Sequence, residues 1–155
     1  MLGESPSACV AIRDGCRARL ERPRCVLDSG GLTALVSGSQ RAREWLRWVI
    51  EHDGSICVPT PVLVVSTSGD GGRDAEVNRI LGVLERAASV LQAPDEATAR
   101  RAGRLRYLAR SDDGIDALVA AAAVGDGSPA VVLTSDPDDL ERLLQHDRHV
   151  AVRAV

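Results

Sequence analysis

The sequence has no lysine and no phenylalanine, and its only aromatic residues are Trp45, Trp48 and Tyr107. So few aromatic side chains argue against the rows of stacking rings with which many single-strand-binding proteins hold bases. All 19 basic residues are arginines, so any phosphate contact would come from a planar guanidinium that can bind two oxygens at once. The net charge of −3 argues against binding duplexes through bulk charge, but it leaves room for a local basic surface.

Long apolar runs are also missing. No segment approaches the roughly 18 residues that a membrane helix requires, so no membrane association is expected. The four cysteines form no Cys-x-x-Cys pair or zinc spacing, and the three histidines do not cluster with them. Cys25 and Cys57 lie in strand-like runs and are expected to be buried thiols. The absence of a glycine-rich phosphate loop or a serine nucleophile elbow disfavours a phosphatase or another small-molecule hydrolase.

A length of 155 residues predicts about one domain with a substantial core. Residues 1–23 differ from the rest, because they mix charges, glycine and proline with only short apolar runs. They lack the apolar core of a signal peptide. We expect an appended N-terminal tail, helical in part between Ala8 and Leu20, followed by a single domain over residues 24–155.

From residue 24 onward, short apolar runs that suit buried strands alternate with segments whose apolar residues recur every three or four positions. This alternation predicts an α/β fold with a mainly parallel central sheet, covered by helices on both faces. Pro61 suits a first helical position, with Thr60 as the expected cap. A glycine-rich turn is expected after Asp28, and a loop over 68–72. The expected strands are 25–27, 56–58, 89–91, 130–133 and 150–152, and the expected helices are 40–52, 61–66, 75–87, 95–108, 115–124 and 137–145.

Three aspartates stand where apolar segments end or begin. Asp28 follows the first expected strand, Asp136 follows a late strand, and Asp116 opens an almost wholly apolar helix. Functional sites of open parallel sheets form outside the carboxyl ends of the strands, so Asp28 and Asp136 are expected at the same edge. Converging carboxylates repel one another unless a cation lies between them. Oxygen-rich clusters of this kind suit Mg²⁺ or Mn²⁺, which activate water and bind phosphodiester oxygens.

Each acid also has a purely structural interpretation. Asp28 can cap the turn at Gly30 and Gly31, and Asp136 can cap the helix that follows it. Asp113 is expected to cap the helix that contains Asp116. Two further acids, Asp138 and Asp139, are expected to be first-turn residues that interact with a helix dipole.

Four blocks of the sequence, taken in order, resemble a known family. They are "CVLDSGGLTALV", "VPTPVLVVSTSGDGGRDAEVNRIL", "SDDGIDALVAAAAV" and "VVLTSDPDDLERLL", and they are similar to the successive motifs of PIN-domain ribonucleases, in particular VapC-type toxins of bacterial VapBC toxin–antitoxin systems. The resemblance covers residues 24–155. It implies a compact three-layer α/β/α sandwich, RNA cleavage that depends on Mg²⁺ or Mn²⁺, a homodimer, a VapB-type antitoxin as partner, and a cytoplasmic location.

The resemblance also implies roles for individual residues. Asp28, Asp116 and Asp136 match the family's catalytic, metal-binding acids. Thr134 and Ser135 match the polar residues that the family has beside the last of these acids. Asp113 is a further candidate close to the metal ligands. The family normally has a glutamate in the helix after the second strand, but Val65 occupies that position here.

Valine can neither bind a cation nor take a proton, so this chain is expected to have little or no activity as written, and Val65→Glu is expected to restore it. Two accounts stay open. Valine is natural and the nuclease is weakened or retired, or it is an inactivating change selected or introduced during expression. In an alternative hypothesis, the chain is a retired binding module. Its acids would then receive an arginine of an antitoxin-type partner, beside an apolar groove between the Trp45/Trp48 helix and the helix over 62–65.

Arginines crowd the expected helix over 95–108. The leading candidates for RNA contacts are Arg100, Arg101 and Arg104, with Arg106 and Arg110 crowding the same helix. Further candidates elsewhere in the chain are Arg41, Arg43, Arg47 and Arg73. The competing interpretation is a solvated surface in a protein whose basic residues are all arginine.

Overall fold

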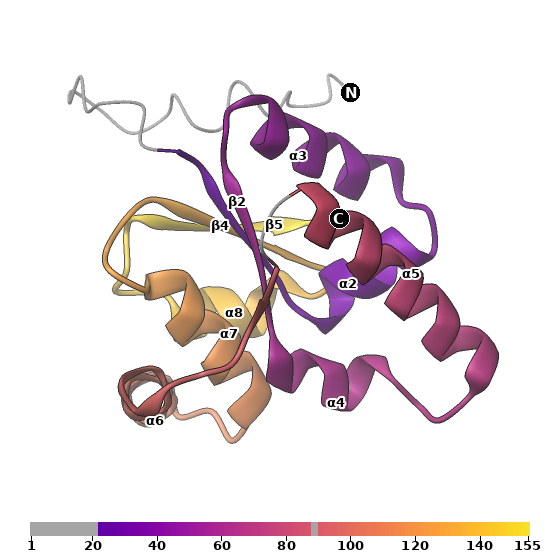
Figure 1. The fold of residues 1–155 in the computed structure, drawn as a ribbon. Coiled ribbons are helices and arrows are strands. Elements are labelled where there is room, and N and C mark those ends of the chain that lie inside the picture. The colour runs from indigo at the N-terminus through magenta and orange to yellow at the C-terminus, as the bar shows by residue number, and fades with distance from the viewer. Residues whose placement is uncertain (1–21, 88–89) are drawn as a thin grey trace.

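The computed structural model describes residues 22–87 and 90–155, and five parallel strands form the centre of the molecule (Figure 1). Their order across the sheet is β3-β2-β1-β4-β5, so the predicted parallel sheet is confirmed. The tail predicted over residues 1–23 lies, up to residue 21, outside the described residues. The strands are β1 (Arg24–Leu27), β2 (Ser55–Pro59), β3 (Leu91–Gln92), β4 (Ala130–Thr134) and β5 (Val150–Ala154).

The central strands are apolar on both faces, as expected for a sheet that helices cover on both sides. All of Cys25, Val26 and Leu27 in β1 are fully buried. Both Cys25 and Cys57 are free, buried thiols, as predicted. Burial raises the pKa of Cys25 far above its usual range and that of Cys57 to about 11, so these thiols are inert core residues.

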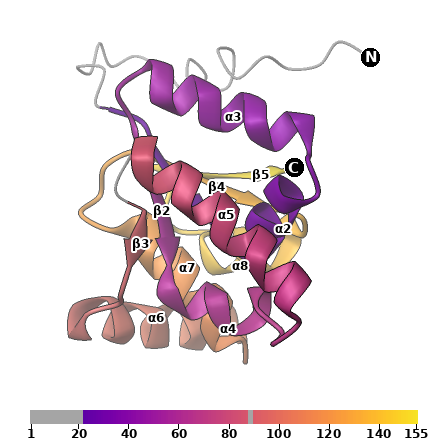
Figure 2. The ribbon, with the colours of Figure 1, turned by 45° about the vertical axis from the view of Figure 1, so that its right-hand side comes forward.

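Helices form a layer on each side of the sheet (Figures 1 and 2). One layer holds α2 (Ser29–Val36), α3 (Gln40–Glu51) and α5 (Gly71–Ala87), and the other holds α6 (Glu96–Ala109), α7 (Gly114–Val124) and α8 (Pro137–Leu143). The alanine-rich α7 packs on β1, β2 and β4 and carries α6 on its outer side. No helix in the described parts of the chain is long and apolar enough to cross a membrane.

The short helix α4 (Leu63–Ser66) follows β2 through a 3₁₀ turn, Thr60–Val62. The expected Thr60 cap is wrong, because Thr60 begins this turn and its side chain makes no capping hydrogen bond. The proposed apolar groove between α3 and α4 is also wrong. The two helices lie at opposite ends of the molecule in both views (Figures 1 and 2).

The glycine-rich turn expected after Asp28 is instead the first turn of α2. The two glycines serve close packing rather than a turn. A Cβ on Gly30 would overlap Ser135, and one on Gly31 would overlap the Leu133 carbonyl. Glycine therefore allows the start of α2 to lie directly against the end of β4, which brings the residues after both strands together.

The loop predicted over 68–72 ends earlier than expected, because α5 begins at Gly71. The Gly72 amide donates to Asp70 Oδ1 at 3.0 Å. In return, Asp74 accepts from the amides of Ser68 and Gly69 at 2.9 and 3.0 Å. Asp70 is the acid nearest to Val65 on its C-terminal side. It is exposed, and its carboxylate accepts from the first turn of α5.

Arg24 holds the C-terminal end of α7 at the amino edge of the sheet. Its Nη2 donates to the Ala122 carbonyl at 3.0 Å and also to the carbonyl of Ala123. A cation at this end of a helix is favoured by the helix dipole. The residue that ends the helix, Gly125, has φ +45°, and a Cβ there would overlap the guanidinium. With this end fixed, the N-terminal end of α7 lies at the carboxyl edge.

Candidate active site

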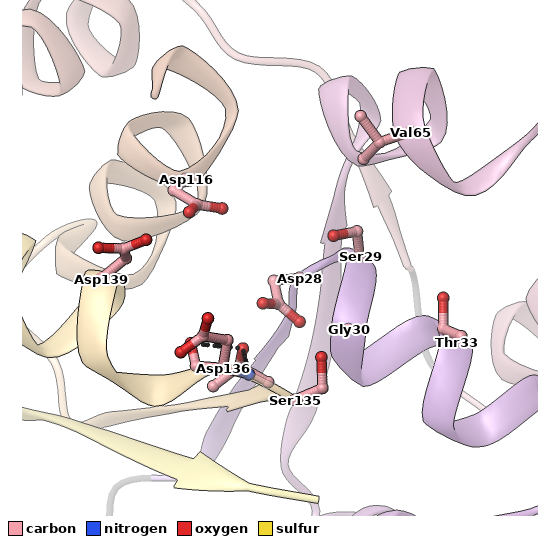
Figure 3. Close-up of a pocket in the computed structure, with 10 residues that line it drawn as sticks. Asp28, Ser29, Gly30, Thr33, Val65, Asp116, Ser135, Asp136 and Asp139 are labelled. Carbon is pink, nitrogen blue, oxygen red and sulfur yellow. Dashed lines mark hydrogen bonds between the residues drawn. The ribbon is translucent and has the colours of Figure 1, made fainter. Parts of the chain in front are cut away.

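A pocket with a volume of about 290 Å³ opens at the carboxyl edge of the sheet, between the ends of β1 and β4. These strands are neighbours, and the chain leaves them toward opposite sides of the sheet, which is where open α/β sheets bind ligands. None of the residues that line the pocket is basic. The lining consists of Asp28, Ser29, Gly30, Thr33, Val65, Asp116, Thr134, Ser135, Asp136 and Asp139 (Figure 3).

Asp28 is buried, with 5% of its surface exposed. Its Oδ1 accepts a hydrogen bond from the Gly31 amide at 2.6 Å, so it caps α2 and also lines the pocket. Burial raises the pKa of Asp28 and the charge of Asp136 raises it further, while hydrogen bonds from Thr134, Gly31 and Gly30 lower it. The net direction is upward, so hydrogen bonds only partly offset the loss of water around this carboxylate.

Asp116 reaches the pocket from the first turn of α7 and faces Asp28 (Figure 3). Burial raises its pKa to about 6, and the charges of Asp113, Asp28, Asp139 and Asp136 add to the shift. Asp113 caps α7 as predicted, since its Oδ1 accepts from the amides of Ile115 and Asp116, both at 2.8 Å. It lies outside the pocket lining, but it fixes the backbone that carries Asp116.

Asp136 follows β4 and lines the pocket without capping α8 through its side chain, so the purely capping role considered for it is wrong. The hydroxyl of Thr134 is buried and holds this segment. It accepts from the Asp136 amide at 3.0 Å and lies 3.1 Å from the Asp136 carbonyl. Its single proton is also within reach of the Asp28 carboxylate. Ser135 is exposed and lines the pocket beside them.

Sequence reasoning did not place four residues of the lining in the site: Ser29, Gly30, Thr33 and Asp139. Asp139 was expected to be only a first-turn residue of α8, but it also lies across the pocket from Asp28 (Figure 3). It pairs with Arg142 on the same helix. Ser29 and Thr33 line the opposite wall. The helical spacing of four between Ser29 and Thr33, directly after Asp28, could have indicated them if α2 had been predicted.

Val65 also lines the pocket, from α4, and is 50% exposed. The structure therefore places this side chain on the same pocket as the acids, where it offers no oxygen. The nearby Ser66 hydroxyl is buried and has no hydrogen-bond partner in the described part of the chain.

The donor types fit a divalent cation, but their arrangement does not complete a site. Asp28, Asp116 and Asp136 form no ion pair with any described residue, and carboxylate oxygens are the ligands that Mg²⁺ and Mn²⁺ prefer. Yet within residues 22–87 and 90–155, no three His, Cys, Asp or Glu side chains are grouped closely enough to hold a metal ion. A metal site that lacks one ligand because Val65 lines its wall would explain both the acids without ion pairs and the absence of a complete ligand group.

The predicted RNA-binding arginines lie on α6, away from the pocket lining. Arg100 pairs with Glu96 at 2.8 Å. Arg101 donates to the Ala121 carbonyl at 3.3 Å, near the far end of α7. Arg104 is exposed.

Comparison with known proteins shows the fold. No family model and no curated protein matches the sequence, but the structure is similar to 14 chains of solved structures. A chain of VapBC2 from Rickettsia felis, bound to a promoter DNA fragment, has a TM-score of 0.66 at 11% identity, covering 85% of this chain and 98% of that one. A chain of DNA-bound VapBC from Salmonella typhimurium gives 0.63 at 17% identity, covering 84% and 97%.

A third similar structure is FitAB bound to an IR36 DNA fragment. Its TM-score is 0.58 at 18% identity, and the match covers 84% of this chain and 94% of that one. These structures confirm the predicted PIN-like α/β/α fold.

Proposed function

We propose that this chain is the PIN-like toxin component of a toxin–antitoxin pair, and that its pocket is that of a Mg²⁺- or Mn²⁺-dependent endoribonuclease weakened or silenced by Val65. One observation carries the proposal. Acids from the end of β1, the start of α7 and the end of β4 surround one pocket that no basic side chain lines. Repelling carboxylates are stable together when a divalent cation or a cationic partner group enters between them.

The chemistry of the site follows from its residues. A bound ion would supply an activated water and would neutralise charge on the phosphate oxygens of RNA. Asp28, Asp116 and Asp136 would hold that ion. Thr134 fixes the Asp136 backbone, and Asp113 fixes the backbone of Asp116. A carboxylate at position 65 would add a donor from α4.

Metal binding tests the proposal without a guess about the RNA sequence. We would titrate Mn²⁺ by calorimetry into this chain and into Val65→Glu. The matched control is Val65→Gln, which has the shape of glutamate without its charge. Tighter binding by about 10- to 100-fold is expected for Val65→Glu alone, a range borrowed from the loss of supporting carboxylates in metal sites. Adding Asp116→Asn to Val65→Glu is expected to abolish the gain.

Cleavage of total RNA in the presence of Mn²⁺ completes the test. Val65→Glu is expected to degrade RNA faster than this chain or Val65→Gln, and EDTA is expected to stop it. If folded Val65→Glu binds Mn²⁺ no better and cuts RNA no faster than this chain, the nuclease proposal is wrong.

A second candidate function is a binding module without catalysis. It is favoured by the exposed apolar side chains of α4, where Val65 lines the pocket and is 50% exposed and its chain neighbour Val64 is 73% exposed. An antitoxin-type partner could place an arginine among the acids and apolar side chains against α4. A peptide with one arginine between leucines should then bind this chain, and both Asp28→Asn and Val64→Asp should weaken its binding. The homodimer implied by the family resemblance also stays a prediction.

A further inference from the structure

One face of α6 stays exposed where the helix ends. Arg104 and Tyr107 are three positions apart, so they share a face of α6, and Arg110 follows at the C-cap. Tyr107 is 83% exposed, more than any other large hydrophobic side chain in the described residues. A tyrosine with that much exposed ring between two arginines has no role in packing α6 against its neighbours.

This end of α6 lies beside the start of α7. Residues 110–113 connect the two helices, and Arg101, near the start of α6, reaches Ala121, near the end of α7. The last turn of α6 is therefore next to the first turn of α7, where the chain passes from one helix to the other (Figures 1 and 2), and that first turn carries Asp116. Arg100 and Arg101, by the same argument, lie toward the end of α7 that is far from the pocket.

The arginines of α6 also differ in what they already bind. Arg100 pairs with Glu96, Arg101 donates to Ala121, and Arg106 Nε donates to the Ser111 carbonyl at 3.3 Å. In contrast, the side chains of Arg104 and Arg110 have no hydrogen bond or ion pair with any described residue. In a chain with a net charge of −3, two such cations at the exposed end of one helix mark a surface for a polyanion.

We propose that Arg104, Tyr107 and Arg110 hold single-stranded RNA where it approaches the pocket. This inference rests on the proposed RNA substrate and says which residues bind it outside the acids. Tyr107 stacks on one unpaired base, and the flanking guanidinium groups contact the phosphates on either side. The order cation–ring–cation matches the alternation of phosphate and base, whereas an acidic peptide would use the arginines and leave the ring without a partner.

RNA binding in EDTA tests the inference apart from cleavage. The probe is a short, fluorescein-labelled, mixed-sequence single-stranded RNA, and its anisotropy gives the affinity. Tyr107→Ala is expected to weaken binding roughly tenfold, within the range measured for base–aromatic stacking. Tyr107→Phe keeps the ring and is expected to bind normally.

A second pair of variants tests the charges. Arg110 has φ +51°, a conformation that glycine adopts at no steric cost, so Arg110→Gly removes the cation while keeping the fold. This variant is expected to bind more weakly and to lower the slope of log affinity against log salt by about 0.7, the value for one phosphate contact on a single strand. The control Arg148→Gln removes an exposed arginine just before β5, at the opposite edge of the sheet, and is expected to leave the slope unchanged.

The possible outcomes distinguish the RNA assignment of α6 from the nuclease proposal. Equal RNA affinity in all variants overturns the assignment of α6 and leaves the nuclease proposal standing. If this chain binds no RNA and Val65→Glu cuts none, both proposals fall together. If polyglutamate binds as tightly as RNA and depends equally on Tyr107, the face of α6 serves an acidic protein, and the RNA assignment is wrong.

Discussion

The two ends of β1 each carry a charged side chain, and the surroundings of the two charges differ. Arg24, at the start of β1, donates to two carbonyls at the end of α7, where a positive charge is favoured. Asp28, directly after β1, accepts from the start of α2 but also faces three other carboxylates of the pocket. Burial raises the pKa of Asp28, and the Asp136 charge raises it further.

The difference separates a structural charge from a functional one. At the amino edge of the sheet, two backbone carbonyls of the fold itself accept from the Arg24 guanidinium, although its Nε stays without a partner among the described residues. At the carboxyl edge, the fold gathers acids, and among the described residues Asp28, Asp116 and Asp136 have hydrogen bonds or backbone contacts but no ion pair. A fold tolerates such a cluster when a ligand completes it, so stability and function are divided between the two ends of the strands.

The largest expected effect comes from removing the Arg24 guanidinium, which binds the end of α7. Arg24→Met should lower the free energy of unfolding by about 3 kcal/mol, because two charge-assisted hydrogen bonds are lost and carbonyls at the end of α7 become buried without partners. Urea unfolding followed by circular dichroism measures the change. Arg24→Lys, which keeps the charge, should lose less. A loss below about 1 kcal/mol in Arg24→Met would contradict the structural role.

The next effect tests the close approach that assembles the pocket. Gly31→Ala should cost about 2 kcal/mol, since its Cβ would overlap the Leu133 carbonyl and push α2 from β4. Gly103→Ala is the matched control in α6, where nothing lies within 4 Å of an added Cβ. This change should stabilise the protein by up to about 1 kcal/mol. Equal effects of the two substitutions would show that helix propensity alone decides.

The comparison also explains what could be predicted from the sequence. Alternating apolar segments were sufficient for the parallel sheet and for most helices. They failed at α2, because the pair Gly30–Gly31 is typical of a turn, and only the position of β4 reveals that close packing requires glycine. They failed at the start of α5 for a related reason, since the Asp70 and Asp74 hydrogen bonds that begin the helix outweigh the poor helix propensity of the glycines.

For the site as well, local sequence patterns predicted some positions, and those that depend on packing could not be predicted. Strand ends predicted that Asp28 and Asp136 share an edge, because parallel strands end together. The pocket position of Asp139 could not be predicted, since a first-turn acid has a sufficient local explanation and its distance from Asp28 depends on how α8 packs. The roles of individual arginines in α6 could not be predicted either, because the hydrogen bond from Arg101 to Ala121 depends on the packing of two helices.

A smaller effect should appear in the pH dependence of the unfolding free energy, through Asp116 in the pocket. In metal-free protein, the pKa of Asp116 is raised from 3.8 to about 6. Between these values the native state binds more protons than the unfolded chain, so stability present at low pH is lost as the pH rises through about 6. The contribution is about 1–2 kcal/mol, because solvent screens this partly exposed carboxylate. Urea unfolding in EDTA at several pH values measures it.

Asp116→Asn is the matched variant for this dependence, because it removes the titrating proton with little change in shape. The difference in unfolding free energy between this chain and the variant should widen from pH 4 to pH 6 and then stay constant. A constant difference over the whole range would mean that the charge of Asp116 is not disfavoured in the folded protein.

The smallest expected effect has the opposite sign to that of Arg24. Asp28→Asn should stabilise the metal-free protein at neutral pH by about 1 kcal/mol, since the Asn oxygen can still accept from Gly31 and a buried repelling charge disappears. Asp95→Asn is the control at another helix start, where the exposed carboxylate is favoured and hydrogen bonds to Thr98 lower its pKa, so stability should fall slightly there. If Asp28→Asn also destabilises the protein, the Asp28 carboxylate belongs with Arg24 as a structural charge, and the division between the two edges of the sheet does not hold.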